Sequence, residues 1–447
     1  MKVLLISPPS HFGPPVFAPL GICYISSYLK ERGIEASCYD MFDNSFSDVE
    51  RLIKKENPDI VGISCFTNLR MEAVEVARIA KRINPNCRVF MGGAHASCMG
   101  EQMLENYPID YIVHREGEKT TYNLINNLNK PQKVNGISFI KNGMITTPPA
   151  PFIDNLDNLP FPDVENLIEN NYKNLTFLYG GEKIELKKKS FTMITSRGCP
   201  YNCIFCSTPR FWGRRWRGRS PENILKEIEF LHDNYGVEHI HFADDSFTIN
   251  QKRTMKLCKM LPKEITFDCE TRVNCVSEEL IKAMKKAGCL IIFYGIESGS
   301  PKILKNINKM ITREQIIKAF KITKEAGIPT KPFLIIGNPG ENLKTIKETI
   351  DLIKKIKPDD MYCALLLVYP DTRLYDIAKE KGMMDDSHWL ENKDPPVFIV
   401  ENPEIKLRYY QFKVISKFLR QSSYYDYFKF MFSRITTFWR YFKRKTH

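Results

Sequence analysis

Three cysteines lie within eight consecutive positions, and their spacing can support chemistry. They are Cys199, Cys203 and Cys206, in the pattern C-x3-C-x2-C directly after the apolar segment Phe191–Ile194. Three thiolates on one loop can hold three corners of a [4Fe–4S] cluster, because soft sulfur ligands suit iron. A structural zinc site normally needs four protein ligands, commonly in paired C-x2-C units, and no second pair occurs nearby. The pattern therefore favours an iron–sulfur cluster with one iron open to another molecule.

The cysteine pattern resembles that of the radical S-adenosylmethionine (SAM) enzymes. In that family the open iron binds the amino and carboxylate groups of SAM, and reductive cleavage of SAM produces a 5′-deoxyadenosyl radical. The resemblance implies that Cys199, Cys203 and Cys206 are the cluster ligands and that Phe205 packs near the adenine of SAM.

Two downstream segments resemble the family's contacts to the methionine part of SAM. Asp244 and Asp245 are expected at the carboxyl end of the second barrel strand, where a TIM-type barrel builds its site. They can accept hydrogen bonds from the SAM ammonium, or one of them can be a helix N-cap. Arg272, in the segment Glu-Thr-Arg, is expected to pair with the SAM carboxylate, although a surface ion pair is the alternative.

Two further segments resemble the family's contacts to ribose and adenine. The segment 295–299, Gly-Ile-Glu-Ser-Gly, ends the fourth barrel strand, and the resemblance assigns its Glu297 and Ser298 to SAM. The glycine-containing turn 335–341 resembles the segment beside the adenine, which assigns Gly337. Five segments in the order of the family argue against a chance match.

The first 130 residues predict a separate α/β domain. Short apolar runs alternate there with amphipathic segments, which indicates a doubly wound parallel sheet of the flavodoxin-like kind. The predicted strands are Val3–Ser7, Ala36–Asp40, Ile60–Ser64, Arg88–Met91 and Tyr111–Val113, and the predicted helices are Leu20–Arg32, Ser47–Glu56 and Arg70–Ile83.

Ligands of such sheets bind beyond the carboxyl ends of the strands. The residues at those ends are mostly small, so that a large ligand can approach the backbone closely, although tight turns need the same residues. They are Pro9, Ser64, Gly92, Gly93, Glu116 and Gly117.

A doubly wound domain ahead of a radical SAM barrel resembles the cobalamin-binding subgroup, called class B when its members methylate. The resemblance covers about residues 1–390 and includes the segments 19–21, 92–95, 116–118 and 156–160. It implies that the six residues at the strand ends contact cobalamin, with the corrin facing the cluster across the domain interface. Flavin or nucleotide binding is the alternative for this fold, but no G-x-G-x-x-G turn follows the first strand.

The cobalt-ligating motif of many cobalamin proteins, D-x-H-x-x-G, is absent from this domain. Pro9-Ser-His11 lacks the aspartate, and Asp386-Ser-His388 lies outside the domain. The resemblance therefore implies a cobalt without that histidine ligand. His11 and His95 lie on loops from which they can touch the corrin, although a loop histidine is more often part of a hydrogen-bonded structure.

The remaining chain completes the predicted domain order. Prolines interrupt residues 131–190, where we expect a hairpin at 136–146 and a linker. Strands and helices alternate again from Phe191 to about Lys381, and the resemblance implies a partial (β/α)6 barrel of the TIM type. We predict a cobalamin domain at 1–130, hairpin and linker at 131–190, a barrel at 191–390 and a helical C-terminal region at 391–447.

Length and composition describe a globular protein of two or three domains, with 447 residues, 43% hydrophobic and 26% charged. No run approaches ~18 apolar residues, and the apolar start of the chain is too short for a secretory signal, so we expect a cytoplasmic protein. The other ten cysteines are then expected to be small buried thiols rather than disulfides.

The net charge of +13 is concentrated at the C-terminus. Residues 401–447 hold 11 Lys and Arg against 3 Asp and Glu, together with 14 of the 52 aromatic residues. A helix that packs its aromatics on the barrel explains this tail, and so does a membrane-surface helix that brings the protein to the inner membrane face. Single-stranded nucleic acid is the least favoured partner, because the rest of the chain is not strongly basic.

These features predict an enzyme with three cofactors, namely a [4Fe–4S] cluster, SAM and cobalamin. The resemblance implies methylation of an unactivated carbon of an organic substrate through a 5′-deoxyadenosyl radical and methylcobalamin, with flavodoxin or ferredoxin as electron donor. The substrate is a lipid or another hydrophobic molecule if the tail meets a membrane. The alternatives are a non-methylating ring closure or oxidation, as in tetrapyrrole biosynthesis, and a cluster-containing sensor without turnover. No catalytic residue beyond the cofactor contacts is identified.

Overall fold

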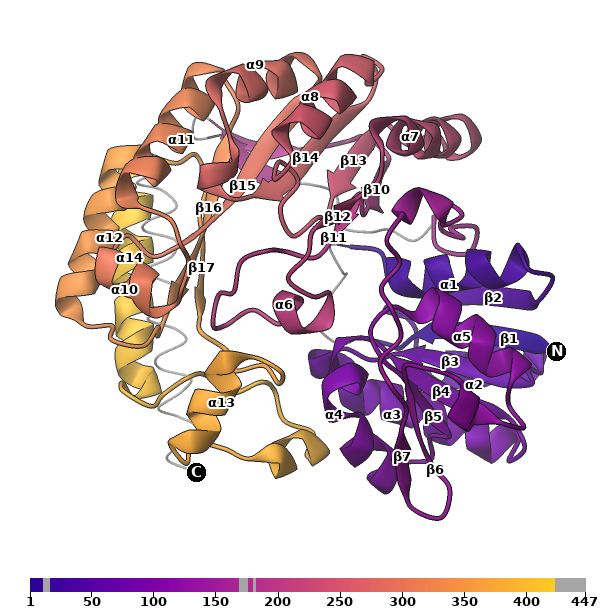
Figure 1. The fold of residues 1–447 in the computed structure, drawn as a ribbon. Coiled ribbons are helices and arrows are strands. Elements are labelled where there is room, and N and C mark those ends of the chain that lie inside the picture. The colour runs from indigo at the N-terminus through magenta and orange to yellow at the C-terminus, as the bar shows by residue number, and fades with distance from the viewer. Residues whose placement is uncertain (11–16, 169–175, 180–181, 423–447) are drawn as a thin grey trace.

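The computed structural model describes residues 1–10, 17–168, 176–179 and 182–422, and it contains two α/β parts side by side (Figure 1). The N-terminal part, indigo to purple in Figure 1, is an open sheet covered by helices. The following part, pink to orange, is a curved sheet with its helices on the outside. The predicted α/β class is confirmed.

The first sheet has seven strands in the order β2-β1-β3-β4-β5-β6-β7. The first five are parallel, and their order is the predicted flavodoxin-like one. Strands β6 and β7 extend the sheet in antiparallel fashion, so the hairpin expected beyond residue 130 pairs with this sheet. The elements are β1 (Lys2–Ser7), α1 (Leu20–Lys30), β2 (Glu35–Asp40), α2 (Phe46–Glu56), β3 (Ile60–Ser64), α3 (Arg70–Ile83), β4 (Arg88–Gly92), α4 (Ala94–Asn106), β5 (Tyr111–Val113), α5 (Gly117–Asn126), β6 (Ile137–Ile140) and β7 (Met144–Thr146).

Helices cover both faces of the first sheet, as continuous apolar strands predict. Leu4 and Ile6 of β1 belong to the core under α2, α3 and α4, whereas Val3 and Leu5 belong to the core under α1 and α5. A ligand therefore approaches this sheet at its carboxyl edge, beyond the strand ends.

The second sheet has six parallel strands in chain order, β10-β13-β14-β15-β16-β17. This is the predicted partial (β/α)6 barrel, with β10 and β17 as its edges. A short antiparallel ribbon, β11–β12, follows β10. The elements are β10 (Ser190–Met193), β11 (Ser196–Arg197), α6 (Thr208–Phe211), β12 (Arg217–Gly218), α7 (Pro221–Tyr235), β13 (His239–Phe242), α8 (Gln251–Met260), β14 (Thr266–Thr271), α9 (Glu278–Lys286), β15 (Cys289–Glu297), α10 (Pro301–Asn306), α11 (Arg313–Glu325), β16 (Thr330–Ile336), α12 (Leu343–Ile356), β17 (Tyr362–Leu365) and α13 (Arg373–Glu380).

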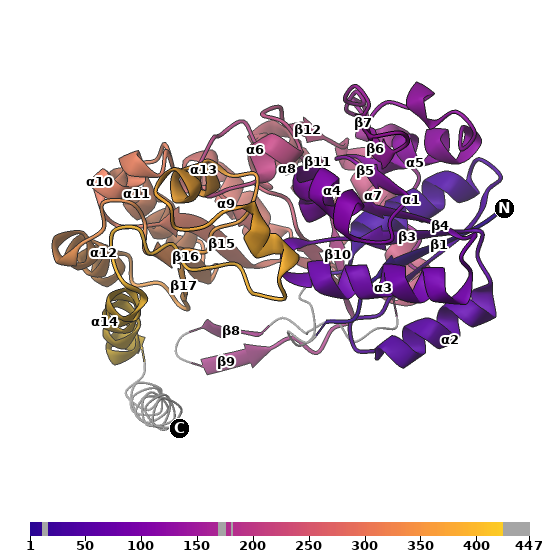
Figure 2. The same ribbon diagram turned by 90° about the horizontal axis from the view of Figure 1, so that it is seen from below.

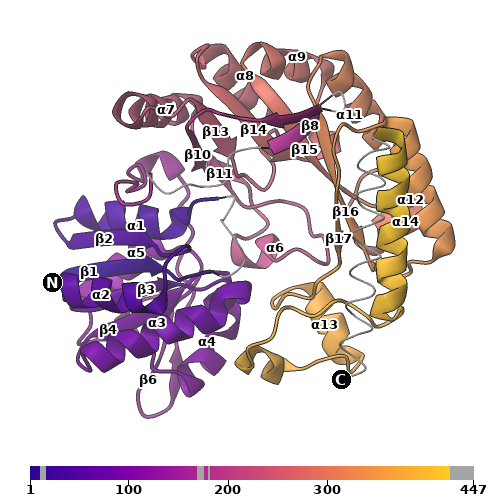
Figure 3. The same ribbon diagram turned by 180° about the vertical axis from the view of Figure 1, so that it is seen from behind.

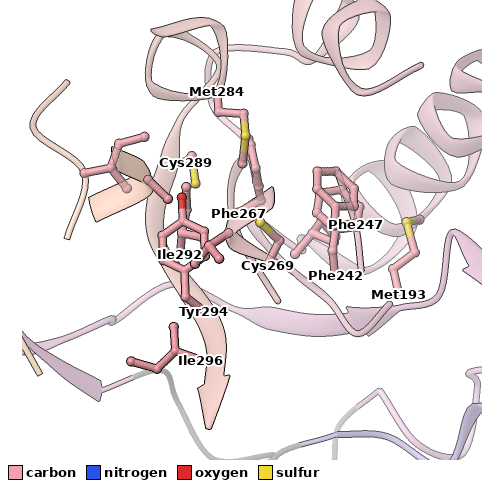
Figure 4. Packing of buried hydrophobic residues seen from close by; sticks show 14 of the residues in the cluster. Met193, Phe242, Phe247, Phe267, Cys269, Met284, Cys289, Ile292, Tyr294 and Ile296 are labelled. Atoms are coloured by element: carbon pink, nitrogen blue, oxygen red, sulfur yellow. The ribbon is translucent and has the colours of Figure 1, made fainter. Parts of the chain in front are cut away.

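Alternation along the barrel strands separates an outer core from the barrel interior. Phe242, Phe267 and Tyr294 pack together in the core between the sheet and its helices (Figure 4). Because successive side chains of a strand point to opposite faces, His241 and Asp268 point into the barrel.

A second hairpin lies in the segment predicted to be a linker. Strands β8 (Thr176–Tyr179) and β9 (Glu182–Glu185) pair antiparallel, and Figure 2 shows them below the barrel. The sequence analysis missed this hairpin, because four-residue strands beside a proline-rich segment carry too little periodicity.

Residues 385–395, which we call the clasp, connect the end of the barrel to the first domain. They contain the 3-10 turn Asp386–Leu390. Arg70 of α3 is buried and donates hydrogen bonds to the carbonyl oxygens of Trp389 (2.9 Å), Lys393 (2.6 Å) and Glu391. The clasp thereby closes the two parts into the ring seen in Figure 1.

Helix α14 (Glu404–Ser422) packs beside α12 and β17 (Figure 3). It buries Leu407, Tyr410, Val414 and Phe418 against the barrel core, which matches packing of tail aromatics on the barrel. The tail beyond residue 422, on which the membrane-surface prediction mainly rests, lies outside the described residues. Within the described ranges, no helix has the length and apolar character needed to cross a bilayer.

Candidate cofactor site

The cysteine loop begins at the ribbon that follows β10. Because β11 pairs with β12, residues 198–216 form a loop closed at its base. Gly198 has a φ of +87°, and a Cβ at this position would lie 2.4 Å from the carbonyl oxygen of Arg215. The close approach requires glycine directly before Cys199.

All three cysteines of the loop are free, with Cys203 buried and Cys199 and Cys206 half-buried. Burial raises the pKa of Cys199 and raises that of Cys206 to about 11. Among the described residues, the one group of three His, Cys, Asp or Glu ligand atoms within 4.8 Å of one another lies elsewhere in the barrel. The three sulfurs therefore do not converge on one point, as the ligands of a single zinc ion must.

Backbone hydrogen bonds hold the loop from two sides. The N–H of Ile204 donates to the carbonyl oxygen of Ile307 (3.1 Å), just after α10, and its carbonyl accepts from the N–H of Leu374 (2.8 Å) in α13. Phe205 is half-buried against the apolar cluster that includes Leu374. Its contact with adenine stays a prediction.

Asp244 and Asp245 have different partners at the end of β13, and neither is the N-cap of α8. Asp244 accepts hydrogen bonds from the N–H (3.0 Å) and hydroxyl (2.8 Å) of Thr195 and from the Ser196 hydroxyl (2.6 Å). Asp245 is exposed and accepts from the Thr208 hydroxyl (2.8 Å). Its surroundings reduce its solvation and raise its pKa to about 6. Asp244 thus holds the start of the cysteine loop, whereas Asp245 remains accessible to a ligand.

Glu270 is an acidic residue of the site to which the sequence alone assigned no function. It is half-buried, and no hydrogen bond or ion pair of its carboxylate is found within the described part of the chain. Burial and the neighbouring charges of Asp268, Asp245 and Glu297 raise its pKa to about 7. The available signal was its place at the end of a barrel strand, because Glu270 lies on β14 two residues after Asp268 and both side chains then point into the barrel.

Arg272 contacts the cysteine loop and is not part of a surface ion pair. Its guanidinium donates to the Sγ of Cys203 (3.9 Å) and to the carbonyl oxygen of Lys309, and it lies 3.5 Å from the ring centre of Tyr201. It is 5% exposed. Arg272 thus places a positive charge beside the second cysteine of the loop.

Glu297 and Ser298 diverge at the end of β15. Glu297 has a φ of +60° and forms a buried ion pair with Lys309 (2.7 Å), the residue whose carbonyl oxygen binds Arg272. Ser298 is buried, and its hydroxyl lies 3.2 Å from that of Thr349 in α12. The structure therefore connects Glu297 to the cysteine loop, whereas the hydrogen bond of Ser298 lies within the barrel wall.

Gly337 has a φ of +106°, which favours glycine at this turn. Its N–H donates to the carboxylate of Glu341 (2.5 Å), and burial raises the pKa of Glu341 to about 7. The turn thus closes on itself at the carboxyl end of β16.

The residues predicted to contact cobalamin lie along one edge, because β1, β3, β4 and β5 are neighbours in the sheet. Gly93 has a φ of +101°, and a Cβ there would lie 2.9 Å from the carbonyl oxygen of Cys65. A Cβ on Gly117 would lie 2.6 Å from the side chain of Ile25. Gly93 is therefore required by the backbone of the edge itself, whereas a side chain at position 117 would displace the end of the Ile25 side chain. The edge also contains Pro9, Ser64 and Gly92.

Glu116 differs from the other edge residues, because its carboxylate is buried in ion pairs. It pairs with Arg197 (2.9 Å) and Arg217 (2.8 Å) of the β11–β12 ribbon. It therefore joins this edge to the base of the cysteine loop.

Neither His95 nor His388 is presented at the edge. His95 is 0% exposed, lies 3.3 Å from the Thr67 hydroxyl and meets the Trp389 ring edge-on at 5.9 Å. Burial lowers its pKa to about 3. His388 belongs to the clasp, and His11 lies outside the described residues.

A cavity of about 550 Å³ lies where α4 and α6 meet. It is bounded by both domains and by the segment that directly follows Cys206. Its lining residues are Ser97, Cys98, Arg115, Pro209, Arg210, Phe211, Gly213 and Asp371.

A buried hydrogen-bonded group lies deeper in the barrel. One oxygen of Asp268 is 2.8 Å from His239 Nε2 and 2.5 Å from His241 Nδ1. Burial by itself would raise the pKa of Asp268, but the two histidines lower it below its ordinary value. These three residues form the one described group with ligand atoms within 4.8 Å, yet the separations are those of hydrogen bonds.

Comparison with known families gives two matches in the order of the two sheets. Residues 14–125 match the B12 binding domain, and residues 193–353 match the Radical SAM superfamily. The first match contains the carboxyl ends of β3, β4 and β5, and the second contains all three cysteines of the loop.

Individual proteins agree with these matches. The chain is 36% identical to an uncharacterized methyltransferase of Pyrococcus horikoshii over 443 residues, 94% of this chain and 91% of that protein. It is 31% identical to the anaerobic magnesium-protoporphyrin IX monomethyl ester cyclase of Rubrivivax gelatinosus over 402 residues, 85% of this chain and 70% of that protein. Its fold is similar to that of the radical SAM methyltransferase TsrM from Kitasatospora setae, with a TM-score of 0.70 at 19% identity over 86% of this chain and 76% of that one. The chain belongs to the B12-binding radical SAM family and is a radical SAM enzyme.

Proposed function

We propose that this enzyme is a cobalamin-dependent methyltransferase that acts on a carbon of an organic substrate. The observation that carries the proposal is the position of the three-cysteine loop, which stands at the end of β10 and is joined by buried ion pairs to the carboxyl edge of the B12 domain. A relative that is similar over 94% of the chain is named a methyltransferase, which supports the same class.

The cysteine loop fits a [4Fe–4S] cluster. Cys199, Cys203 and Cys206 are free thiols on one loop, and soft sulfur ligands suit iron. Arg272 places a positive charge beside Cys203. When bound, the cluster, SAM and the corrin supply the methyl group and the radical chemistry, while the protein binds, orients and shields them.

Different residues of the barrel interior are suited to bind different parts of SAM. We assign Asp245 and Glu270 to the SAM ammonium, because both carboxylates face the site and have capacity for further hydrogen bonds. We assign Arg272 to the SAM carboxylate. Glu297 and the Gly337 turn are assigned to the ribose and adenine, and Asp244 and Ser298 act through the loop and the barrel wall.

The carboxyl edge of the first sheet fits a corrin. Gly92, Gly93 and Gly117 carry no side chain to hold it away from the backbone, and Pro9 and Ser64 are small. We propose that it lies on these residues without His95 as a cobalt ligand, since His95 is fully buried under the clasp.

Radical SAM enzymes need a reductant, and we propose a flavodoxin or ferredoxin for this one. If the C-terminal tail binds a membrane surface, we propose that the substrate is a lipid or another hydrophobic molecule.

The proposal is tested with anaerobically reconstituted enzyme, cobalamin, a strong reductant and SAM labelled in its methyl group. We expect S-adenosylhomocysteine, 5′-deoxyadenosine and label in the corrinoid fraction. No cobalamin retained by protein with an intact cluster would contradict the proposal.

A ring closure without methylation is the second candidate, because the cyclase relative is 31% identical over 85% of the chain. In that case the same assay yields 5′-deoxyadenosine, with cobalamin bound and no label in the corrinoid fraction.

A further inference from the structure

A buried group of four charges, which we call the charge bridge, joins the cysteine loop to the B12 domain. It consists of Arg197 and Arg217 on the ribbon and Glu116 and Glu118 at the start of α5, with side chains at most 6% exposed. Arg197 donates to Glu116 (2.9 Å) and to Glu118 (2.5 Å). Arg217 donates to both oxygens of Glu116 (2.8 and 3.0 Å).

The linker between the domains is bound into the charge bridge. The N–H of Ile153 donates to Glu116 (2.6 Å), and the carbonyl oxygen of Ile153 accepts from Arg217 (2.7 Å). Glu116 therefore receives hydrogen bonds from both strands of the ribbon and from the linker. In a buried network, a shift of any one segment leaves charged donors or acceptors unpaired, which is costly.

Stability alone is a weak explanation for the charge bridge. Burying ions costs solvation free energy that their mutual attraction only partly offsets, and apolar residues of similar volume are often as stable. Charge-assisted hydrogen bonds require a defined geometry, and the planar arginine guanidinium binds carboxylates in defined directions. The charge bridge thus specifies a distance and an orientation between the segments that it joins.

Those segments carry the two proposed metal sites. Arg197 is two residues before Cys199, and the backbone of Gly198 between them packs closely against that of Arg215. At the other end, Glu116 adjoins Gly117 on the corrin edge. We propose that Arg197 and Glu118 are positioning residues that set the distance and orientation between the cluster and the cobalt. This inference rests on the proposed binding of both groups.

A matched control lies at the surface of the loop, two residues before the ribbon strand β12. Arg215 pairs with Asp154 of the linker at 2.7 Å, but the two side chains are 73% and 71% exposed. Exposed pairs of this kind contribute little and do not fix geometry. Arg215→Ala removes an arginine two positions from Arg217 without touching the charge bridge.

The test uses the full chain loaded with cluster and cobalamin and reduced to paramagnetic cluster and cobalt(II). Pulsed electron paramagnetic resonance measures the dipolar interaction between the two spins. We expect a narrow distribution of dipolar frequencies in the unaltered protein and in Arg215→Ala. We expect a shifted or broadened distribution in Arg197→Ala and in the milder Glu118→Gln, at unchanged iron and cobalt contents. Arg197→Lys keeps the positive charge but not the planar guanidinium. We expect its distribution of dipolar frequencies to be intermediate between those of the unaltered protein and Arg197→Ala.

Unchanged dipolar frequencies in Glu118→Gln and Arg197→Lys, with both metals bound, would overturn the inference. If Arg197→Ala loses the cluster, Glu118→Gln decides, because it removes one charge and keeps both arginines. If the unaltered protein binds no cobalamin or no cluster, the proposed function fails first, which the metal contents show directly.

Discussion

Single residues of this site act through charge and burial as much as through their chemical type. Glu270 illustrates this, because burial and three nearby carboxylates raise its pKa to about 7 while no described side chain neutralises it. Such a group binds a cation well and destabilises the protein that contains it.

We expect Glu270→Gln to stabilise the protein at high pH and to weaken SAM binding. A carboxyl with a raised pKa in the folded state costs stability as the pH rises, because ionisation is easier in the unfolded chain. The gain should be about 3 kcal/mol at pH 8 and should fall below about 1 kcal/mol at pH 4.5. Chemical denaturation at both pH values measures it, with the exposed Glu264→Gln as control. A gain independent of pH would show that the Glu270 pKa is ordinary.

The cysteines of the loop should be separable from the other ten. We expect Cys203→Ser to prevent assembly of a [4Fe–4S] cluster, because a hydroxyl is a poor substitute for a soft thiolate ligand. Iron and sulfide contents after anaerobic reconstitution measure this. Cys258→Ser, a half-buried free cysteine on α8, should retain full iron content. Equal iron in both variants would rule out the cluster assignment.

At the scale of elements, the loop and its ribbon are determined by backbone approach. Gly198 combines a left-handed conformation with a carbonyl oxygen at 2.4 Å from a would-be Cβ, whereas Gly236 at the end of α7 has a φ of +69° and open space around it. The two glycines share a conformation and differ in their surroundings.

We therefore expect Gly198→Ala to be more damaging than Gly236→Ala. The left-handed conformation costs about 1–2 kcal/mol in both, and only position 198 adds a clash with backbone. Thermal unfolding and iron incorporation measure the difference, and only Gly198→Ala should lose iron. Similar losses at both positions would mean that the loop can relax.

At the scale of the whole molecule, the charge bridge and the clasp join the two domains at separate places. The clasp depends on Arg70, which donates to three clasp carbonyl oxygens and to that of Thr67 (2.9 Å). Its removal leaves several buried acceptors without a donor.

Arg70→Ala is expected to destabilise the protein by about 2–4 kcal/mol and to make the clasp accessible to protease. Arg82 lies on the same helix, is exposed and pairs with Glu50 at 3.0 Å, so Arg82→Ala should change stability little. Denaturation and limited proteolysis of both variants provide the comparison. Proteolysis in the clasp at the unaltered rate would show that Arg70 does not hold it.

Local sequence patterns were sufficient to predict much of the fold. Short apolar runs that alternate with amphipathic segments identified both sheets, because a strand covered on both faces is apolar throughout and each helix must bury one stripe whatever its partners are. The spacing of Cys199, Cys203 and Cys206 was enough to predict the proposed cluster loop, because all three residues come from one short segment. The short strands β8 and β9 escaped detection, because four residues carry no reliable period.

Only the tertiary structure decided which polar residues face one another. Glu116 was predicted to contact a ligand, yet its carboxylate forms ion pairs with Arg197 and Arg217. Asp244 was also predicted to contact a ligand, yet its carboxylate accepts hydrogen bonds from Thr195 and Ser196. Arg70 and the clasp lie about 320 positions apart. A charged residue shows in sequence that it needs a partner, but the partner is chosen by the packing of distant elements. Local sequence patterns therefore predict the fold, but they do not predict how the two proposed metal sites are positioned relative to each other.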